Sequence, residues 1–281
     1  MLYKYFALGI PGTTDGNELL RRLERMLSAG EVYFSSPERF NDPFDCNPKI
    51  VVPDRRSKPF IDSFTRSGER HGRSIGQIAQ DYRERLKLPD AEWVDKVTQL
   101  AIARIRAVGV LCVTPKRDNP LMWAHYANCH TGICVGFHRS GALMDAQSVR
   151  YAGNVRPEYD HVSGTTDQFY DVFFRKANCW AYEEEQRLVS MDIGPSATRK
   201  FAADKVRNVN EPLARFMERE PGPGTFELGP DAVGEVVMGY GISEANRNSV
   251  LELVRNSGKN IGIFECRLHD NEYVMEVIPV T

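Results

Sequence analysis

The sequence has no long hydrophobic run and no excess of charge of either sign. No apolar stretch approaches the roughly 18 residues that a membrane helix needs, so we expect no membrane span. Lys and Arg number 36 and Asp and Glu number 38, which gives a formal net charge of −2. That balance excludes a global basic field for gathering nucleic acid. Any contact with nucleic acid has to be local.

Cysteine is sparse, and there is no sign of a secretion signal. The six cysteines are scattered, without the dense short spacings of secreted disulfide scaffolds. The first residues, Met1 to Phe6, lead directly into strand-like sequence and contain no apolar signal-peptide core. We therefore expect reduced thiols and a cytoplasmic protein.

Phosphate-binding and zinc motifs are also missing. The chain contains no GxGxxG and no P-loop, which argues against Rossmann or P-loop NTPase chemistry. His125, Cys129, His130 and Cys134 follow one another closely, but their spacing fits neither a zinc ribbon nor a zinc finger. We assign no metal ligand.

The hydrophobic pattern predicts a mixed α+β chain. Short apolar runs between turn residues predict strands at 2–8, 31–35, 109–114, 133–137, 149–151, 187–191, 233–238, 261–266 and 273–277. Apolar residues at three- and four-residue spacing predict helices at 15–30, 75–86, 93–105, 121–127, 169–176, 200–220 and 243–258. We expect a single domain over 1–281 with a helical insertion at about 54–106. The role of the insertion stays open between a lid, a partner surface and plain packing.

The segment 180–187 places three glutamates in a row before a strand. In extended backbone Glu183, Glu185 and Arg187 share one face, while Glu184 points to the other. Two carboxylates and a guanidinium would then be neighbours. A purely structural interpretation is a solvated strand edge with an ion pair. On the functional interpretation, Glu184 tolerates substitution and its neighbours do not.

Aromatic rings flank these carboxylates and recur in a second segment. Trp180 and Tyr182 precede them, and Trp123, His125 and Tyr126 lie in a helical turn between two strand-like runs. Connections of this kind often line a site in α/β folds. Rings beside carboxylates favour a cleft in which a ligand stacks. For the histidine, a structural role remains the competing interpretation.

A loop rich in Pro, Asn and Asp, at 36–53, carries another set of candidates. Asn41 and Asp42 lie between two phenylalanines in this loop. Their side chains either bond their own backbone, as such residues do in turns, or face a ligand. The local sequence leaves both interpretations open.

Taken together and in this order, the segments resemble the bacterial family catalogued as domain of unknown function 2971. The matching pieces lie within about residues 2–265, and they are 2–5, 33–37, 40–45, 109–114, 121–127, 132–137 and 180–187. Their joint order is specific, although each piece alone is weak. This resemblance names a family and implies no activity.

The layout is also similar to ADP-ribosyltransferase domains. Those domains place a polar residue on the first strand, a Ser, Thr or Tyr on a middle strand, and a glutamate entering a late strand. The resemblance implies a mixed, largely antiparallel split sheet and NAD as substrate. The matching positions here are Tyr3, Lys4 or Tyr5, then Ser35 or Thr114, and then Glu183 with Glu185. Lys4 stands nearest to the position where such domains usually have His or Arg.

The resemblance implies an NAD-dependent ADP-ribosyltransferase or NAD glycohydrolase, of the kind found in toxins and phage defence, with a protein or nucleic-acid acceptor. Cleaving the nicotinamide–ribose bond develops positive charge, which the Glu185 carboxylate would stabilise. Glu183 would orient or deprotonate the acceptor, and Arg187 completes the catalytic set. The expected nucleotide contacts are Tyr3, Lys4, Tyr5, Ser35, Asn41, Asp42, Thr114, Trp123, His125, Tyr126, Trp180 and Tyr182.

Two other functions compete with this one. The first is a non-catalytic module that binds a nucleotide or nucleic acid through the same aromatic and Glu/Arg cleft. The second is a metal-dependent nuclease, which would need Asp42, Asp45, Glu183 and Glu185 to converge on a divalent ion.

Overall fold

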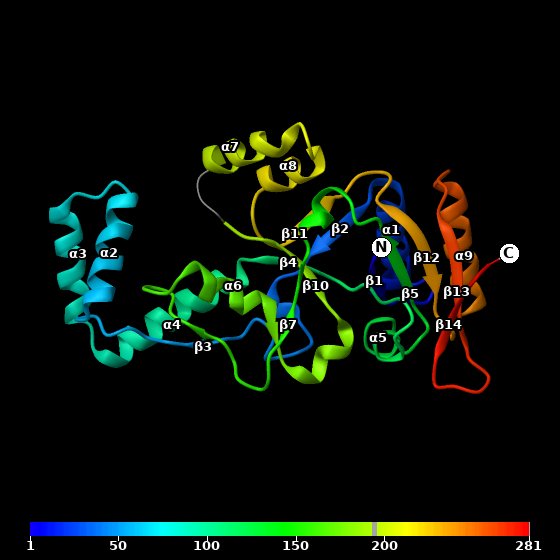
Figure 1. Cartoon of the computed structure of the whole chain (residues 1–281), viewed down its shortest axis with the longest axis horizontal. Helices are drawn as coiled ribbons and strands as arrows, with labels where there is room; N and C mark the ends of the chain where they lie inside the picture. Colours follow the sequence, from blue (N-terminus) through cyan, green and yellow to red (C-terminus); the bar gives the residue numbers. More distant parts are fainter. Residues whose placement is uncertain (193–195, 281) are drawn as a thin grey trace. The chain divides into compact units, whose positions relative to one another are not determined.

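The computed structural model describes residues 1–192 and 196–280, and the chain divides into two compact units (Figure 1). Unit 1 consists of Met1–Ser35, Gly109–Val149 and Cys179–Thr281, and unit 2 of Ser36–Val108 and Arg150–Asn178. The mixed α+β class is confirmed. The expected helical insertion at about 54–106 falls inside unit 2.

The larger sheet of unit 1 has the strand order β1-β5-β12-β13-β14. Its strands are β1 (Leu2–Phe6), β5 (Ile133–Phe137), β12 (Val233–Met238), β13 (Gly262–Leu268) and β14 (Met275–Pro279). The pair β12–β13 is parallel and the other neighbours are antiparallel, so the sheet is mostly antiparallel. The burial of all five β5 residues agrees with its continuous apolar sequence.

A second sheet of unit 1 is built around β4 (Gly109–Val113). It has the order β4-β10-β6, with β10 at Gln186–Ser190 and β6 at Gln147–Ser148. A separate strand pair joins β2 (Glu31–Phe34) to β11 (Gly224–Glu227). Two isolated bridges, Tyr3↔Thr114 and Ser35↔Val110, connect β1 and β2 to the β4 segment. β4 is therefore the element at which the sheets of unit 1 meet.

Five helices described in unit 1 connect its strands. They are α1 (Thr14–Ala29), α5 (Pro120–Tyr126), α7 (Ser196–Arg207), α8 (Glu211–Glu218) and α9 (Glu244–Asn256), with short 3-10 turns η2 (Gly141–Asp145) and η3 (Asn178–Glu183). Of these, α1 and α9 pack on the larger sheet. One continuous core contains Leu27 of α1, Val236 of β12 and Val250 of α9, all nearly inaccessible to solvent. Figure 1 shows α7 and α8 as an adjacent helical pair.

Unit 2 is mainly helical, as the sequence predicted for its part at about 54–106. Its helices are α2 (Lys58–Arg70), α3 (Ile75–Lys87), α4 (Asp90–Arg106) and α6 (Thr166–Phe174), preceded by the turn η1 (Pro37–Arg39). Two short parallel pairs join β3 (Lys49–Ile50) to β8 (Glu158–Tyr159) and β7 (Arg150–Tyr151) to β9 (Arg175–Lys176). Phe60, Trp93 and Val97 form a small core between α2 and α4.

None of the helices that the structure describes has both the length and the apolar character that crossing a membrane requires.

Candidate functional site

Three segments with candidate site residues meet around β4 in unit 1. Antiparallel pairing places Arg187 of β10 opposite Cys112 of β4. Just beyond the strand, the backbones of Thr114 and Tyr3 exchange hydrogen bonds of 2.7 and 2.9 Å. The Thr114 hydroxyl then donates to the backbone oxygen of Glu183 at 2.6 Å. Segments far apart in the sequence are thus tied together by short, directional bonds.

The backbone of the glutamate segment differs from the predicted one. The sequence pattern predicts extended backbone from Glu183 to Arg187, but Glu183 ends the 3-10 turn η3 and β10 begins only at Gln186. Between them Glu184 has a φ of 45°, in the left-handed region. The regular alternation was therefore wrong here. Even so, Glu183 and Glu185 are buried while Glu184 is exposed, because the left-handed residue turns the chain between them.

Glu185 and Arg187 form a buried two-point ion pair. Arg187 Nε donates to Glu185 Oε1 at 2.8 Å, and Nη2 donates to Oε2 at 2.9 Å. The Arg187 side chain is fully inaccessible and that of Glu185 nearly so. A guanidinium in this geometry favours the ionised carboxylate and fixes its plane. The pair is therefore not the solvated strand edge of the structural interpretation.

Lys4 and Cys112 lie beside this pair. The Lys4 ammonium donates to the backbone oxygen of Cys112 at 3.2 Å. Burial, and next the Glu185 carboxylate, raise the pKa of the Cys112 thiol. The thiol therefore stays protonated at neutral pH and is unsuited to nucleophilic attack. The bond from Lys4 connects β1 to β4. Its ammonium also places positive charge near the Cys112 thiol, on which the Glu185 carboxylate acts as well.

Glu183 is held by α5. The Tyr126 hydroxyl donates to Glu183 Oε1 at 2.6 Å. The Asn119 side-chain amide donates to the backbone oxygen of Tyr182 at 2.8 Å, while its oxygen caps α5. Asn119 was not among the predicted site residues. The pair Asn119-Pro120 is a helix-start signal, with a capping residue followed by proline, and it predicts the cap but not the contact to Tyr182.

An aromatic cluster adjoins the buried carboxylates. The His125 ring lies 6.0 Å from that of Trp180, 6.2 Å from that of Tyr182 and 6.3 Å from that of Tyr126, measured between centroids. His125 is exposed, and the other three rings are half-buried. α5 and η3 thus present a partly exposed aromatic face whose Tyr126 reaches Glu183 directly. Such a face suits stacking on a planar ligand.

Two predicted nucleotide contacts belong to the core instead. Trp123 is fully buried, and its indole nitrogen donates to the Arg117 backbone oxygen at 2.9 Å. Tyr5 is buried at 5.1 Å from Trp123, edge to face, and its hydroxyl donates to the Lys116 backbone oxygen. Trp123 of α5 and Tyr5 of β1 pack in one buried cluster. The apolar sequence around them is the signal of a core, and the burial of both rings agrees with that role.

Tyr3 is directed to a polar pair that the sequence analysis missed. Burial, and next the Glu235 carboxylate, raise the pKa of Tyr3 to about 12. Glu235 Oε1 accepts from Arg117 Nη1 at 2.7 Å. Glu235 and Arg117 are separated by more than a hundred residues, and no local pattern links them. Tyr3 therefore lies beside the ion pair of Glu235 and Arg117. Its side chain is buried and largely inaccessible to a ligand.

Ser35, which follows β2, bonds to β4 at a position away from the candidate site. Its backbone nitrogen donates to the Val110 oxygen at 2.9 Å. Val110 and Thr114 are four residues apart, which at roughly 3.3 Å per residue of strand is about 13 Å. Of the two middle-strand candidates, only Thr114 bonds to the glutamate segment.

The Asn41–Asp42 loop belongs to unit 2. Asp42 is buried, and its carboxylate accepts from the Phe44 backbone nitrogen at 2.9 Å. This bond is the turn geometry of the structural interpretation. Asn41 is exposed. Asp45 lies 3.5 Å from Lys176, and both side chains are buried.

The nuclease alternative requires a cluster of acidic ligands. Within residues 1–192 and 196–280, no group of three or more His, Cys, Asp or Glu side chains could hold a metal ion. Asp42 and Asp45 belong to unit 2, and Glu183 and Glu185 belong to unit 1. No family model, curated protein or solved structure matches the chain.

Proposed function

We propose that unit 1 is an NAD-cleaving enzyme, either a glycohydrolase or an ADP-ribosyltransferase, whose active region is the Glu183–Arg187 segment with the aromatic face of α5. The observation that carries the proposal is the meeting of β1, the end of β4 and the glutamate segment through Thr114 and Tyr3. The two sheets joined at that point are compatible with an ADP-ribosyltransferase-like split sheet.

The fixed charge of Glu185 fits the electrostatics of this reaction. As nicotinamide leaves with the bonding electron pair, positive charge develops on the ribose. A carboxylate that is already ionised and oriented stabilises that charge without rearranging. The two bonds from Arg187 favour both conditions, because a guanidinium that donates to both oxygens stabilises the charged carboxylate and fixes its plane.

Glu183 suits the second half of the reaction. Water or an acceptor hydroxyl attacks the ribose carbon, and its proton has to go to a base. The Glu183 carboxylate lies at the aromatic face and is oriented by the Tyr126 hydroxyl. Trp180, Tyr182 and His125 supply rings for stacking on the nicotinamide or adenine.

Release of nicotinamide from NAD tests the proposal, because hydrolysis by water needs no further acceptor. We expect release by the wild type and a loss of about 100- to 1,000-fold in Glu185→Gln, as for other preorganised electrostatic groups. Tyr126→Phe, which removes only the hydroxyl that orients Glu183, should lower kcat and leave the fold intact. Glu184→Gln is the matched control and should keep its activity.

Two outcomes would contradict the proposal. One is a wild type that releases no nicotinamide, either in buffer or with cell extract supplied as a source of acceptors. The other is an equal loss in Glu184→Gln and Glu185→Gln. Circular dichroism on each variant separates loss of activity from loss of fold.

The burial of the Glu185–Arg187 pair favours a second candidate, a non-catalytic nucleotide-binding module. A buried ion pair can also serve to fix local structure. In that case the aromatic face of α5 and η3 would bind the nucleotide without turnover. Saturable NAD binding with no nicotinamide release, weakened by Trp180→Ala, would establish this candidate over the first.

A further inference from the structure

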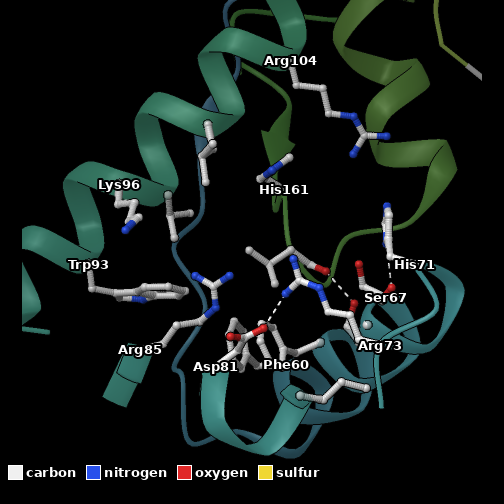
Figure 2. Close-up of a pocket in the computed structure, with 17 residues that line it drawn as sticks. Phe60, Ser67, His71, Arg73, Asp81, Arg85, Trp93, Lys96, Arg104 and His161 are labelled. Atoms are coloured by element: carbon white, nitrogen blue, oxygen red, sulfur yellow. Dashed lines mark hydrogen bonds and ion pairs between the residues drawn. The ribbon is translucent and has the colours of Figure 1, made fainter. Parts of the chain in front are cut away.

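Unit 2 contains a cavity of about 370 Å³ (Figure 2). It is lined by residues of α2, α3 and α4, by the turn between α2 and α3, and by His161 and Val162. Phe60 and Trp93 are buried at its base, with ring centroids 5.5 Å apart, while Phe64 and Leu100 offer partly exposed apolar surface. The volume lies within the usual range for small-molecule pockets.

The cavity is strongly basic although the whole chain is slightly acidic. Its basic lining residues are His71, Arg73, Arg85, Lys96, Arg104 and His161. The acidic lining residue among those described is Asp81, which pairs with Arg73. Since the formal net charge of the chain is −2, composition alone does not explain this cluster. Like charges gathered around one space favour an anionic occupant.

The most direct evidence for a ligand is a buried hydrogen-bond donor of Arg85. Its guanidinium carbon lies 4.9 Å from the centroid of the Phe64 ring. Its Nε is buried and has no hydrogen-bond partner among the residues that the structure describes. A buried donor without an acceptor is costly and uncommon, and a ligand oxygen would satisfy it. Burial lowers the pKa of Arg85, as expected for a cation with too little compensation.

Of the other basic groups, Arg104 already has protein partners and His161 is neutral. Arg104 donates to the Tyr159 hydroxyl at 3.3 Å and stacks 4.4 Å above the Phe169 ring. Burial, and next the charge of Arg104, lower the pKa of His161, so its ring is neutral at pH 7. Figure 2 shows Arg85 and Lys96 on the side of the cavity where Trp93 lies. These two cations are therefore the groups best placed to meet an anion.

We propose that this cavity binds a small planar phosphorylated molecule, of the size and chemistry of a nucleoside monophosphate. The phosphate is bound by Arg85, with Lys96 at the exposed rim, and the planar base packs on the apolar surface of Phe64, Trp93 and Leu100. Arginine is suited to phosphate because its planar fork offers parallel donors. Aromatic and apolar walls accept a base without specific hydrogen bonds. The proposal concerns unit 2 alone and is independent of the proposed NAD cleavage.

Calorimetry on the full chain with AMP as the probe tests the proposal. We expect saturable binding that weakens as salt is raised. Adenosine has the base without the phosphate, and inorganic phosphate has the anion without the base. Both should bind more weakly than AMP. Arg85→Met keeps the apolar stem and removes the donors, and it should weaken AMP binding by about tenfold or more.

The matched control is Arg83→Met, on the same helix but outside the cavity, which should bind AMP as the wild type does. Lys96→Met changes an exposed side chain and should weaken binding even if Arg85→Met fails to fold.

Absence of saturable AMP binding at millimolar concentration would overturn the proposal. So would equal losses in Arg83→Met and Arg85→Met, equal affinity for phosphate and AMP, or binding of an oligonucleotide but not of AMP.

Discussion

At the scale of single residues, two consecutive glutamates occupy opposite environments. Glu185 is buried and bonded twice to Arg187. The Glu184 side chain is 52% exposed and lies 3.4 Å from Lys116. Exposed ion pairs contribute little to stability, whereas breaking a buried pair is strongly destabilising. The same substitution should therefore have very different effects at the two positions.

We predict that Glu185→Gln lowers the free energy of unfolding by on the order of 3 kcal/mol, because it weakens a buried ion pair. Glu184→Gln should change it by less than about 0.5 kcal/mol, as is usual for exposed positions. Urea denaturation followed by circular dichroism measures both. Equal destabilisation by the two variants would show that the buried pair does not contribute as the geometry implies.

The sequence predicted this contrast, but from a backbone that is not present. Period-two alternation put Glu184 on the opposite face, whereas the actual cause is its left-handed φ of 45°. That conformation follows from the end of η3, where Glu184 N donates to the Ala181 oxygen. The bonds from Tyr126 and Asn119 that hold the segment span 57 and 63 residues. Local patterns carry no information on contacts of that length.

At the scale of elements, helix ends were the most predictable features. Gly30 ends α1 in the left-handed conformation, and Ser243 caps α9, both as the sequence indicated. The predicted start at residue 15 was one residue late, because Thr13 caps α1 and the helix begins at Thr14. Asp15 is also a capping residue type, so propensity alone could not decide between Thr13 and Asp15.

Gly30, at the end of α1, and Gly12 both have a positive φ, but a Cβ added at each would meet different surroundings. A Cβ at Gly30 would lie 2.3 Å from the Gly229 oxygen and 2.8 Å from the Ala232 Cβ, at a φ of +67°. Gly12 has a φ of +87°, and a Cβ added there would meet nothing within 4 Å. Alanine at Gly12 therefore meets backbone strain alone, while alanine at Gly30 meets strain and overlap.

We predict that Gly12→Ala costs about 1 to 2 kcal/mol, the usual cost of a left-handed residue with a Cβ. Gly30→Ala should cost about 1 to 3 kcal/mol more, because the neighbouring backbone has to shift. Equilibrium urea denaturation of the two variants gives the difference. Similar values for both would mean that the contact between Gly30 and Gly229 relaxes easily.

The two-residue strands were the least predictable elements. The pairs β3–β8 and β7–β9 have no period that could be recognised in so few residues. Lys49 pairs with Glu158, more than a hundred residues away. Their position depends on the packing of unit 2 as a whole. For that reason the sequence predicted a helical insertion at about 54–106 but not that 150–178 belongs to the same unit.

At the scale of the whole molecule, the two units are interleaved along the chain. Unit 2 takes its residues from two separate segments, Ser36–Val108 and Arg150–Asn178. The first segment leaves and rejoins unit 1 at neighbouring points, because Ser35 N donates to the Val110 oxygen at 2.9 Å. The second also begins and ends close together, since Arg150 pairs with Arg175. Short linkers could therefore replace both segments.

The second segment depends on the first for its packing. Tyr159 and Phe169 lie 5.4 Å apart, and Arg104 of the first segment contacts both of them. Removing 36–108 alone would also take away β3, the partner of β8. The remaining aromatic residues would then be exposed, which promotes aggregation.

We predict that a chain in which short Gly-Ser linkers replace both 36–108 and 150–178 folds cooperatively as unit 1. A chain in which only 36–108 is replaced should aggregate or lose its cooperative transition. Thermal unfolding by circular dichroism, with size-exclusion chromatography, distinguishes the two. The double replacement retains Glu183, Glu185 and Arg187 with their β4 contacts, so it also shows whether unit 1 alone carries any nicotinamide release. Identical behaviour of the two chains would mean that the segments of unit 2 do not fold as one body.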